Sequence, residues 1–179
     1  MNEDIAPADE AERLERRFGF LRPGVLRDYH RRLSGLDALN RLLEQGEQAL
    51  PIGACLGFRA VSVTTGRAIF EGEAELHQCN PFGMLHGGLA AAMLDSALGC
   101  AVNTTLAPGH GYGTVDLAVK YLRPIPPDGR LLRAEGQVVH AGRTMATADA
   151  TLKGVDDDKL YATGTTTCLI YPLTERGEI

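Results

Sequence analysis

The sequence has no uncharged apolar run that reaches the ~18 residues required to span a membrane. Its most apolar stretch, residues 85–102, contains Asp95 and several glycines and is better explained as a buried helix. The first residues are acidic and lack the apolar segment of a signal peptide. We therefore expect a cytoplasmic protein that is not inserted in a membrane.

Cysteine is also scarce, and the spacing of the four cysteines argues against several kinds of site. There is no CxxC pair and no recognisable disulfide framework, so reduced thiols are expected. The nearest approach to a zinc-ligand cluster, His77, Cys79 and His86, has irregular spacing, and we expect no bound metal. Cys79 as a nucleophile is an alternative, but the sequence offers it no evident base partner.

Positive charge is not in excess either, because 18 Lys and Arg residues against 23 Asp and Glu residues give a formal net charge of −5. This balance provides no overall attraction for nucleic acid or for an anionic membrane. An anionic ligand would need a local group of bases. The length of 179 residues suffices for one domain whose core folds without disulfides or metals.

Residues 1–49 differ from the rest of the chain and are rich in Glu, Arg and Leu. Acids followed by bases predict a helix over 7–18, and three- and four-residue apolar spacing predicts two more, over 25–33 and from 36 to near Gly46. A helix-turn-helix module is a weak alternative, because acids outnumber bases here. We expect a helical extension with its charged faces in solvent.

From residue 50 onward, the pattern predicts strands around one long apolar helix. Alternating polar and apolar residues predict strands at about 56–63, 68–76, 112–124, 131–141, 144–154 and 159–171. The helix begins at Gly87, between the second and third strands, and needs cover on nearly every side. We therefore expect an α+β domain over 50–179, in which a curved antiparallel sheet of about six strands wraps around the helix.

A single carboxylate, Asp95, interrupts the small and apolar run from Gly87 to Val102. Burying it is costly unless it is paired. Four of the six positions on its helix face, at steps of three, four and seven residues, are Gly or Ala, and these small residues let a ligand or another backbone approach closely. Tight packing alone, with a local hydrogen-bond donor for the carboxylate, is the alternative. We expect a functional acid.

The turn ahead of the helix offers the complementary group. Gly87 and Gly88 open the helix, so their N–H groups have no partner four residues earlier and can donate to a developing oxyanion. His86 is either catalytic or a scaffold for the turn, and we favour the scaffold. Asn80 precedes a proline and is held extended, so its amide either bonds the turn or faces a ligand.

Gly87 and Asp95 cannot easily act together within one chain. They are eight residues apart, about 12 Å along a helix, whereas a base and an oxyanion donor must both lie within ~3 Å of the reacting atoms. Two antiparallel helices related by a two-fold axis bring Gly87 of one protomer to Asp95 of the other. We expect a homo-oligomer whose active sites are shared between protomers.

The motif Asn80-x-x-Gly83-x-x-His86-Gly87-Gly88, followed by Asp95, resembles that of the PaaI-like branch of the hotdog-fold acyl-CoA thioesterases. The stretch 114–117 and the strand end Tyr121-x-Arg123-Pro124 support the resemblance, which covers about residues 50–172. It implies a sheet wrapped around the central helix, paired subunits that often form a dimer of dimers, and hydrolysis of a thioester.

The resemblance also implies a role for each matching residue. Asp95 matches the general base or nucleophile, and the Gly87 amide matches the group that polarises the thioester carbonyl. Asn80 and His86 match residues that shape the turn and contact the thioester. Thr114 matches a hydroxyl that orients water, although relatives often carry Ser at this position.

Substrate-binding residues follow from the same motif and from the charge of coenzyme A. Gly83 and Gly88 belong to the turn and are expected to line the thioester region. CoA is anionic, so Arg143, after Gly142, and Arg123 are candidates for its phosphates. No cofactor is expected, because a thioester is already an activated carbonyl.

Two other functions remain open at this point. One is a non-catalytic acyl-CoA-binding regulatory module, for which a buried acid would serve no purpose. The other is a hotdog dehydratase or hydratase, whose relatives usually pair a His with the acid in a different way.

Overall fold

A computed structural model describes residues 14–44 and 50–173. Its helices are α1 (Val25–His30), α2 (Gly35–Leu43), α3 (Pro51–Leu56), the 3-10 helix η2 (Leu76–Gln78) and α4 (Gly87–Asn103). Its strands are β1 (Phe58–Thr64), β2 (Arg67–Glu73), β3 (His110–Tyr121), β4 (Leu131–Ala141), β5 (Met145–Gly154) and β6 (Leu160–Pro172). The element order agrees with the sequence prediction except for α3, η2 and the helix expected over 7–18.

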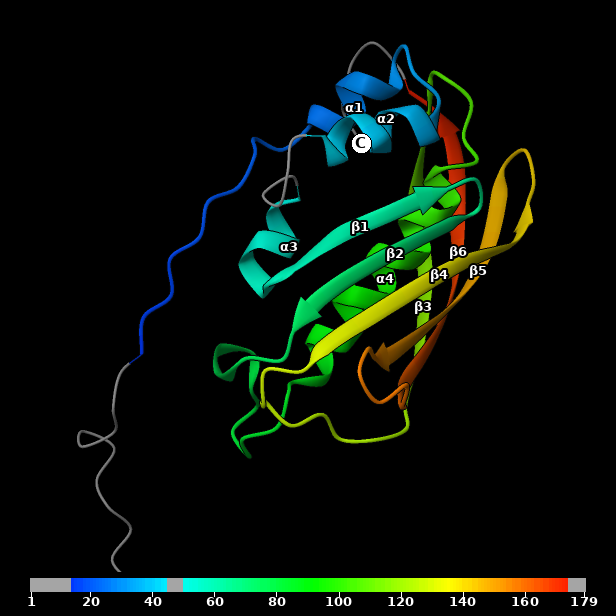
Figure 1. Ribbon diagram of the computed structural model, residues 1–179. Helices are drawn as coiled ribbons and strands as arrows, with labels where there is room; N and C mark the ends of the chain where they lie inside the picture. The colour runs from blue at the N-terminus through cyan, green and yellow to red at the C-terminus, as the bar shows by residue number, and fades with distance from the viewer. Residues whose placement is uncertain (1–13, 45–49, 174–179) are drawn as a thin grey trace, which may run out of the picture.

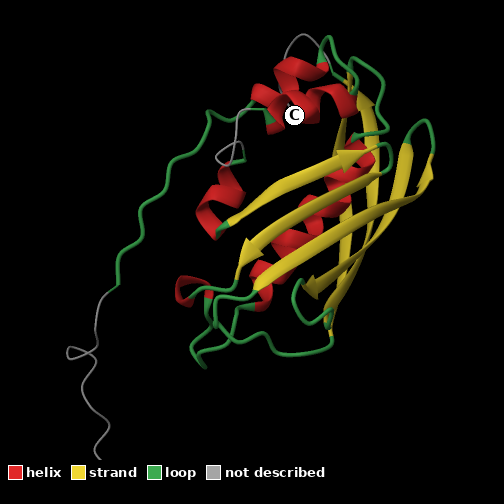
Figure 2. Ribbon diagram, in the orientation of Figure 1, coloured by secondary structure: helices red, strands yellow, loops and turns green. Residues whose placement is uncertain are grey.

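The six strands form one antiparallel sheet in the order β1-β2-β4-β5-β6-β3. The sheet curves around α4, which packs on its concave face and contacts all six strands (Figures 1 and 2). The buried core joins α4 to the inner strand faces through Leu94, Leu98, Phe70 and Leu152. The expected α+β hotdog architecture is confirmed.

The close approach of α4 to the sheet depends on a strand glycine. A Cβ atom built on Gly136 of β4 would lie 2.3 Å from the carbonyl oxygen of Ala97. Any larger residue would push the helix off the sheet, since interiors are close-packed. This contact fixes the depth at which α4, and therefore Asp95, sits in the curve of the sheet.

Strand β3 is one edge of the sheet and is largely exposed. Its register against β6 shifts between Thr114 and Asp116, so that Val115 bulges outward with a relative exposure of 66%. Tyr121, at the end of the strand, is 56% exposed. A long uncovered edge with apolar side chains is a natural surface for pairing with another strand.

The N-terminal part differs from its prediction in two places. The helix expected over 7–18 is wrong in its described part, because residues 14–18 run without helical structure along α3 (Figure 1). The hydrogen bonds of Arg16 to that helix outweigh the weak helical propensity of the segment. Residues 1–13 and the expected helix end near Gly46 lie outside the described residues.

Helix α3 was not predicted, and it precedes the first expected strand, which it overlaps only at Leu56. Pro51 stands in its first turn, and Gly57 ends it in the left-handed conformation, with φ of 82°. Proline at a helix start and glycine just after a helix end are typical signals of a helix. The alternation of polar and apolar residues that follows indicated a strand instead. The two other short helices, α1 and α2, occur where apolar spacing predicts them, and Ser34 caps α2 by accepting a hydrogen bond from the Asp37 N–H.

Candidate active site

The turn before α4 is held by Asn80. Its Oδ1 accepts hydrogen bonds from the N–H groups of Phe82 (2.9 Å) and Met84 (3.3 Å), and its own N–H donates to the Met84 carbonyl. Gly83 adopts φ of 77°, which only glycine takes easily, and completes the turn. The carboxamide oxygen therefore serves the turn, while the nitrogen makes no hydrogen bond within the described chain.

His86 is the N-cap of α4. Its Nδ1 accepts a hydrogen bond from the Gly88 N–H at 2.8 Å, and its own N–H donates to the Gln78 carbonyl at 2.8 Å. Because Nδ1 is the acceptor, a neutral His86 carries its ring proton on Nε2. The cap also occupies the Gly88 amide, which the sequence left as a second candidate donor. Of the two glycine amides, the Gly87 N–H alone has no hydrogen-bond partner within the described residues.

Tyr121 binds the carbonyl of Gly87, although it was not among the predicted site residues. Its hydroxyl donates to the Gly87 carbonyl at 3.0 Å, and its ring covers Gly87 so closely that a Cβ there would lie 3.2 Å from Cζ. Tyr121 stands in the strand-end motif with Arg123 and Pro124. This motif was the sequence signal that could have indicated a role for Tyr121 at the turn.

A cavity of about 420 Å3 opens between this turn and the end of β3. It brings together four predicted residues: Asn80, His86, Gly87 and Arg123. The remaining lining residues are mostly apolar, namely Met84, Leu85, Ala90, Tyr121, Leu122, Pro124 and Ile125. Asp95 and Thr114 do not line it, so one chain presents the turn and the carboxylate in separate places.

Asp95 lies two turns further along α4 and is half-buried. Thr114 of β3 donates its hydroxyl to Asp95 Oδ1 at 3.2 Å. Within the described chain no Lys or Arg forms an ion pair with Asp95, and the Thr114 hydroxyl is the hydrogen-bond donor that contacts its carboxylate. A carboxylate in such a place is available to accept a proton from water.

The thiols near Asp95 are poor candidates for nucleophiles. Burial, with a smaller contribution from the Asp95 charge, raises the pKa of Cys100 to about 12. Burial also raises the pKa of Cys168, which pairs with Thr114 across β3 and β6. Both thiols stay protonated near neutral pH, and the reactive species is the thiolate.

Tyr112 packs against α4 near Asp95. Its ring packs on Gly99, one helical turn beyond Asp95, where a Cβ would lie 2.6 Å from the tyrosine hydroxyl oxygen. Burial is the main reason that the pKa of Tyr112 lies well above its ordinary value. One of the small residues that the sequence placed on the Asp95 face therefore accommodates an aromatic ring.

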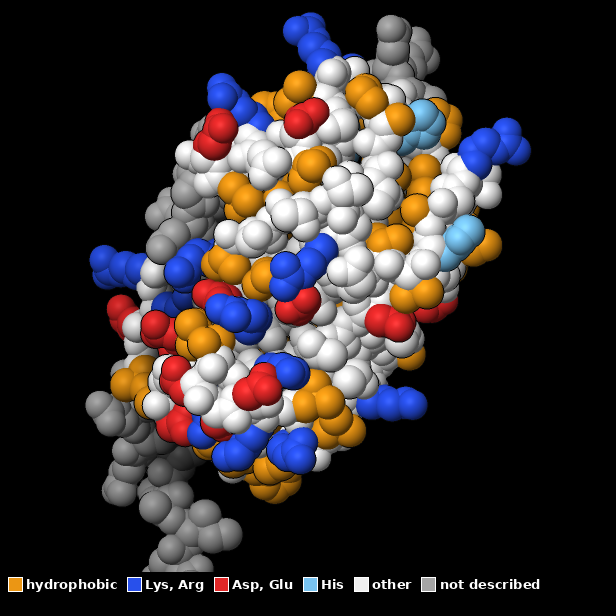
Figure 3. Space-filling view, turned by 45° about the vertical axis from the view of Figure 1, so that its right-hand side comes forward, with side chains coloured by type: hydrophobic (Ala, Val, Ile, Leu, Met, Phe, Trp, Pro, Cys, Tyr) orange, Lys and Arg blue, Asp and Glu red, His pale blue; other side chains and the backbone are white. Residues whose placement is uncertain are grey.

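The two predicted arginines lie in different regions. Arg123 lines the turn cavity and donates from Nη1 to the Leu160 carbonyl at 2.6 Å. Arg143 is exposed in the β4–β5 hairpin, far from the Asn80–Gly88 turn in the same chain (Figure 1). Positive and negative side chains intermingle on the face that Figure 3 shows, without one extended basic area.

Within residues 14–44 and 50–173, no group of three or more His, Cys, Asp or Glu side chains is placed to hold a metal ion. In the same part of the chain, no helix is long and apolar enough to cross a membrane.

Comparison with known proteins gives consistent matches. The sequence matches the thioesterase superfamily over residues 82–161. Acyl-coenzyme A thioesterase 13 of Homo sapiens is 31% identical over 104 residues, which cover 58% of this chain and 73% of that protein. Proteins of Caenorhabditis elegans and Halobacterium salinarum that bear esterase names are 34% and 41% identical, over 112 and 69 residues. These matches cover 63% and 37% of this chain, and the chain spans 65% and 44% of those two relatives.

Solved structures agree with the fold. A thioesterase from Haemophilus influenzae superposes with a TM-score of 0.67 at 20% identity, over 83% of this chain and 98% of that one. An Asn-to-Asp variant of the phenylacetic acid degradation protein PaaI from Thermus thermophilus gives a TM-score of 0.61 at 28% identity, over 67% and 98% of the two chains.

A curved sheet around one central helix, with a His-Gly-Gly turn at the helix start, defines a hotdog protein of the thioesterase type. The chain belongs to the thioesterase superfamily and, within it, to the PaaI-like thioesterases.

Proposed function

We propose that this protein hydrolyses an acyl-CoA thioester to a free acid and CoA. The observation that carries the proposal is the half-buried Asp95 carboxylate, which accepts a hydrogen bond from Thr114 in an otherwise apolar helix. The name of its relative acyl-coenzyme A thioesterase 13 supports the substrate class. Residues 50–179 form the catalytic domain in this proposal, and residues 1–49 form an extension to it.

Asp95 acts as the general base, with Thr114 orienting the carboxylate and the attacking water. The water gives one proton to Asp95, and its oxygen attacks the thioester carbon. The resulting oxyanion accepts a hydrogen bond from the Gly87 amide, at a helix start whose dipole favours negative charge. Collapse breaks the carbon–sulfur bond, and the proton held by Asp95 passes to the departing sulfur. Direct attack by the carboxylate is the alternative route.

The active site is shared between two subunits in this proposal. The turn cavity of one chain does not include its own Asp95, and the exposed edge of β3 offers a surface for a second copy. Pairing two copies about a two-fold axis brings the Gly87 amide of one to the Asp95 region of the other. Arg143, which is exposed, is the proposed contact for a CoA phosphate.

Wild-type protein is expected to release CoA from at least one member of a panel of short, long and aromatic acyl-CoAs. Typical enzyme turnover of about 1–10³ s⁻¹ is the scale to expect, measured by trapping the free thiol. If acyl-CoAs bound tightly but no member of the panel released CoA, the non-catalytic regulatory module would be favoured instead. Water addition to an enoyl-CoA without CoA release would favour a hydratase.

Shared sites predict complementation between two inactive variants. Co-expression of differently tagged Asp95→Asn and Gly87→Pro chains, followed by purification through both tags, gives mixed dimers. Each mixed dimer holds one intact site and one doubly altered site, so roughly half of the wild-type activity per dimer should return. Activity no higher than that of either variant alone would show that both groups act within one chain.

A further inference from the structure

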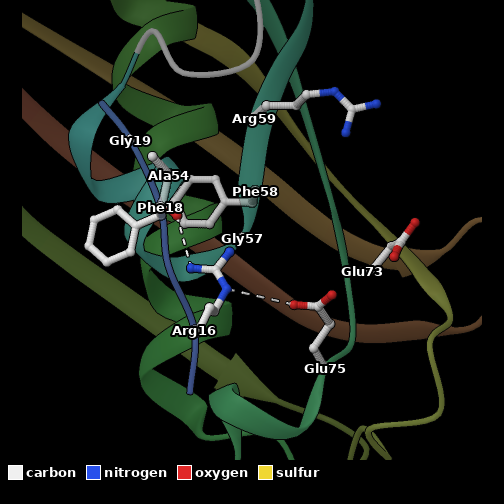
Figure 4. Close-up of a pocket in the computed structure, with 10 residues that line it drawn as sticks. Arg16, Phe18, Gly19, Ala54, Gly57, Phe58, Arg59, Glu73 and Glu75 are labelled. Atoms are coloured by element: carbon white, nitrogen blue, oxygen red, sulfur yellow. Dashed lines mark hydrogen bonds and ion pairs between the residues drawn. The ribbon is translucent and has the colours of Figure 1, made fainter. Parts of the chain in front are cut away.

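The N-terminal segment is attached to α3 through Arg16. The guanidinium donates from Nη1 to the carbonyls of Ala54 (3.0 Å) and Cys55 (2.7 Å), in the last turn of the helix. Its Nε also lies 4.0 Å from Glu75 Oε2. A cation on the free carbonyls at a helix C-terminus is a favourable arrangement. Figure 4 shows Arg16 reaching between α3 and Glu75 from the segment that carries Phe18.

Gln78 joins the same end of α3 to the turn of the candidate site. This side chain is buried, with only 6% exposure. Its Nε2 donates to the Leu56 carbonyl at 2.7 Å, and its Oε1 accepts from the Glu75 N–H at 2.8 Å. Its backbone carbonyl accepts from the His86 N–H at 2.8 Å. One residue thus bonds the end of α3, the N-cap residue of its own helix η2 and the N-cap residue of α4.

Arg16 and Gln78 meet at Gly57, which ends α3 with φ of 82°. A Cβ built there would lie 2.9 Å from Gln78 Nε2 and 3.3 Å from Arg16 Nη2. The two side chains therefore both approach the same position beside Gly57, at the end of α3. A pocket of about 480 Å3 lies next to this joint, lined by residues that include Arg16, Phe18, Gly57 and Glu75 (Figure 4).

We propose that Gln78 is a positioning residue that couples the Arg16-held N-terminal segment to the turn bearing His86 and Gly87. This inference rests on the proposed function, because the Gly87 amide is the group whose position matters. The Gln78 carbonyl holds the peptide immediately before that amide, and the Gln78 side chain holds the carbonyl in place. Release of the side chain from α3 shifts the donor, and a misplacement of ~1 Å can cost about 10²-fold in rate.

The test compares Gln78→Met, Arg16→Met and the double variant with two matched controls. Arg22→Met removes an arginine of the same segment whose side chain is 79% exposed and, among the described residues, pairs with Asp28 alone. Gln137→Met removes a glutamine of β4, outside both the turn and α3. Arg16→Lys serves as the conservative replacement, because it keeps a cationic donor for the α3 carbonyls.

Each single variant should lower kcat for CoA release by about 10-fold or more, toward a limit of about 10²-fold, with KM changed less than about twofold. The double variant should be no slower than the slower single variant, because coupled residues act non-additively. Arg16→Lys should recover most of the rate, and both controls should match the wild type. An unchanged kcat in the folded single variants, or full additivity, would overturn the coupling.

A structural measurement keeps this test separate from that of the proposed function. Hydrogen–deuterium exchange of the peptide covering residues 79–89 should speed up in Gln78→Met and also in Arg16→Met, but in neither control. Faster exchange in a protein that hydrolyses no acyl-CoA would retain the positioning role and remove the thioesterase function. Unchanged exchange in Arg16→Met would contradict the link to the N-terminal segment.

Discussion

Asp95→Asn should lower kcat for CoA release by about 10²–10⁴-fold, the usual contribution of a general base. Asparagine has nearly the shape of aspartate and still offers Thr114 an acceptor oxygen, so the contact at 3.2 Å can persist. What it loses is the ability to take a proton from water. The KM should change by no more than a few-fold, because the carboxylate is not assigned to CoA binding.

The measurement is thiol release at saturating acyl-CoA, with circular dichroism and light scattering to verify folding and oligomer size. Asp149→Asn is the matched control, since Asp149 is an exposed carboxylate of β5 that lies outside the candidate site. It should retain wild-type activity. Equal rates in Asp95→Asn and wild type would remove Asp95 from the mechanism, whatever the state of the rest of the site.

Gly87→Pro should lower kcat by about 10²–10³-fold, the effect of losing one oxyanion donor. Gly87 is the first residue of α4, where proline is well tolerated because the N–H has no helical partner. His86, with φ of −65° and ψ of 135°, already has the extended conformation that a following proline requires. The substitution therefore deletes the amide proton with little change to the helix.

Gly87→Ala separates the donor from the added bulk. Both substitutions place a Cβ 3.2 Å from the Tyr121 ring, which is 56% exposed and can move by a few tenths of an ångström. Only proline lacks the N–H. Gly87→Ala should stay within about fivefold of the wild-type kcat, far less than the loss of a donor. Equal losses in the two variants would assign the effect to crowding at Tyr121 instead of to the amide.

The fold was predictable from the sequence because its strongest signals are local. The alternation in β2 and the apolar character of α4 determine which faces must be buried, and antiparallel strands around one helix satisfy both. Local signals failed where tertiary contacts compete with them. Residues 14–18 have a helical composition but follow α3 instead, because Arg16 finds the carbonyls at its end.

In the candidate site, too, the sequence indicated the local features and missed the contacts that depend on tertiary structure. Asp95 and the glycine turn stood out in the sequence as a carboxylate in an apolar helix and as free amides at a helix start. The sequence did not reveal that His86 occupies the Gly88 amide or that Tyr121 holds the Gly87 carbonyl. Both contacts depend on the path of the backbone around the turn, and the second joins residues 34 positions apart.

By itself, the sequence determined the central helix, its single acid and the turn that opens it, because periodicity and the cost of a buried charge act over a few residues. Only the tertiary structure decided which groups surround that acid. Folding of the chain brings Thr114 to Asp95 and places Gln78 and Arg16 at the end of α3. These contacts join segments that are distant in the sequence, so their geometry depends on the tertiary fold and not on local sequence signals.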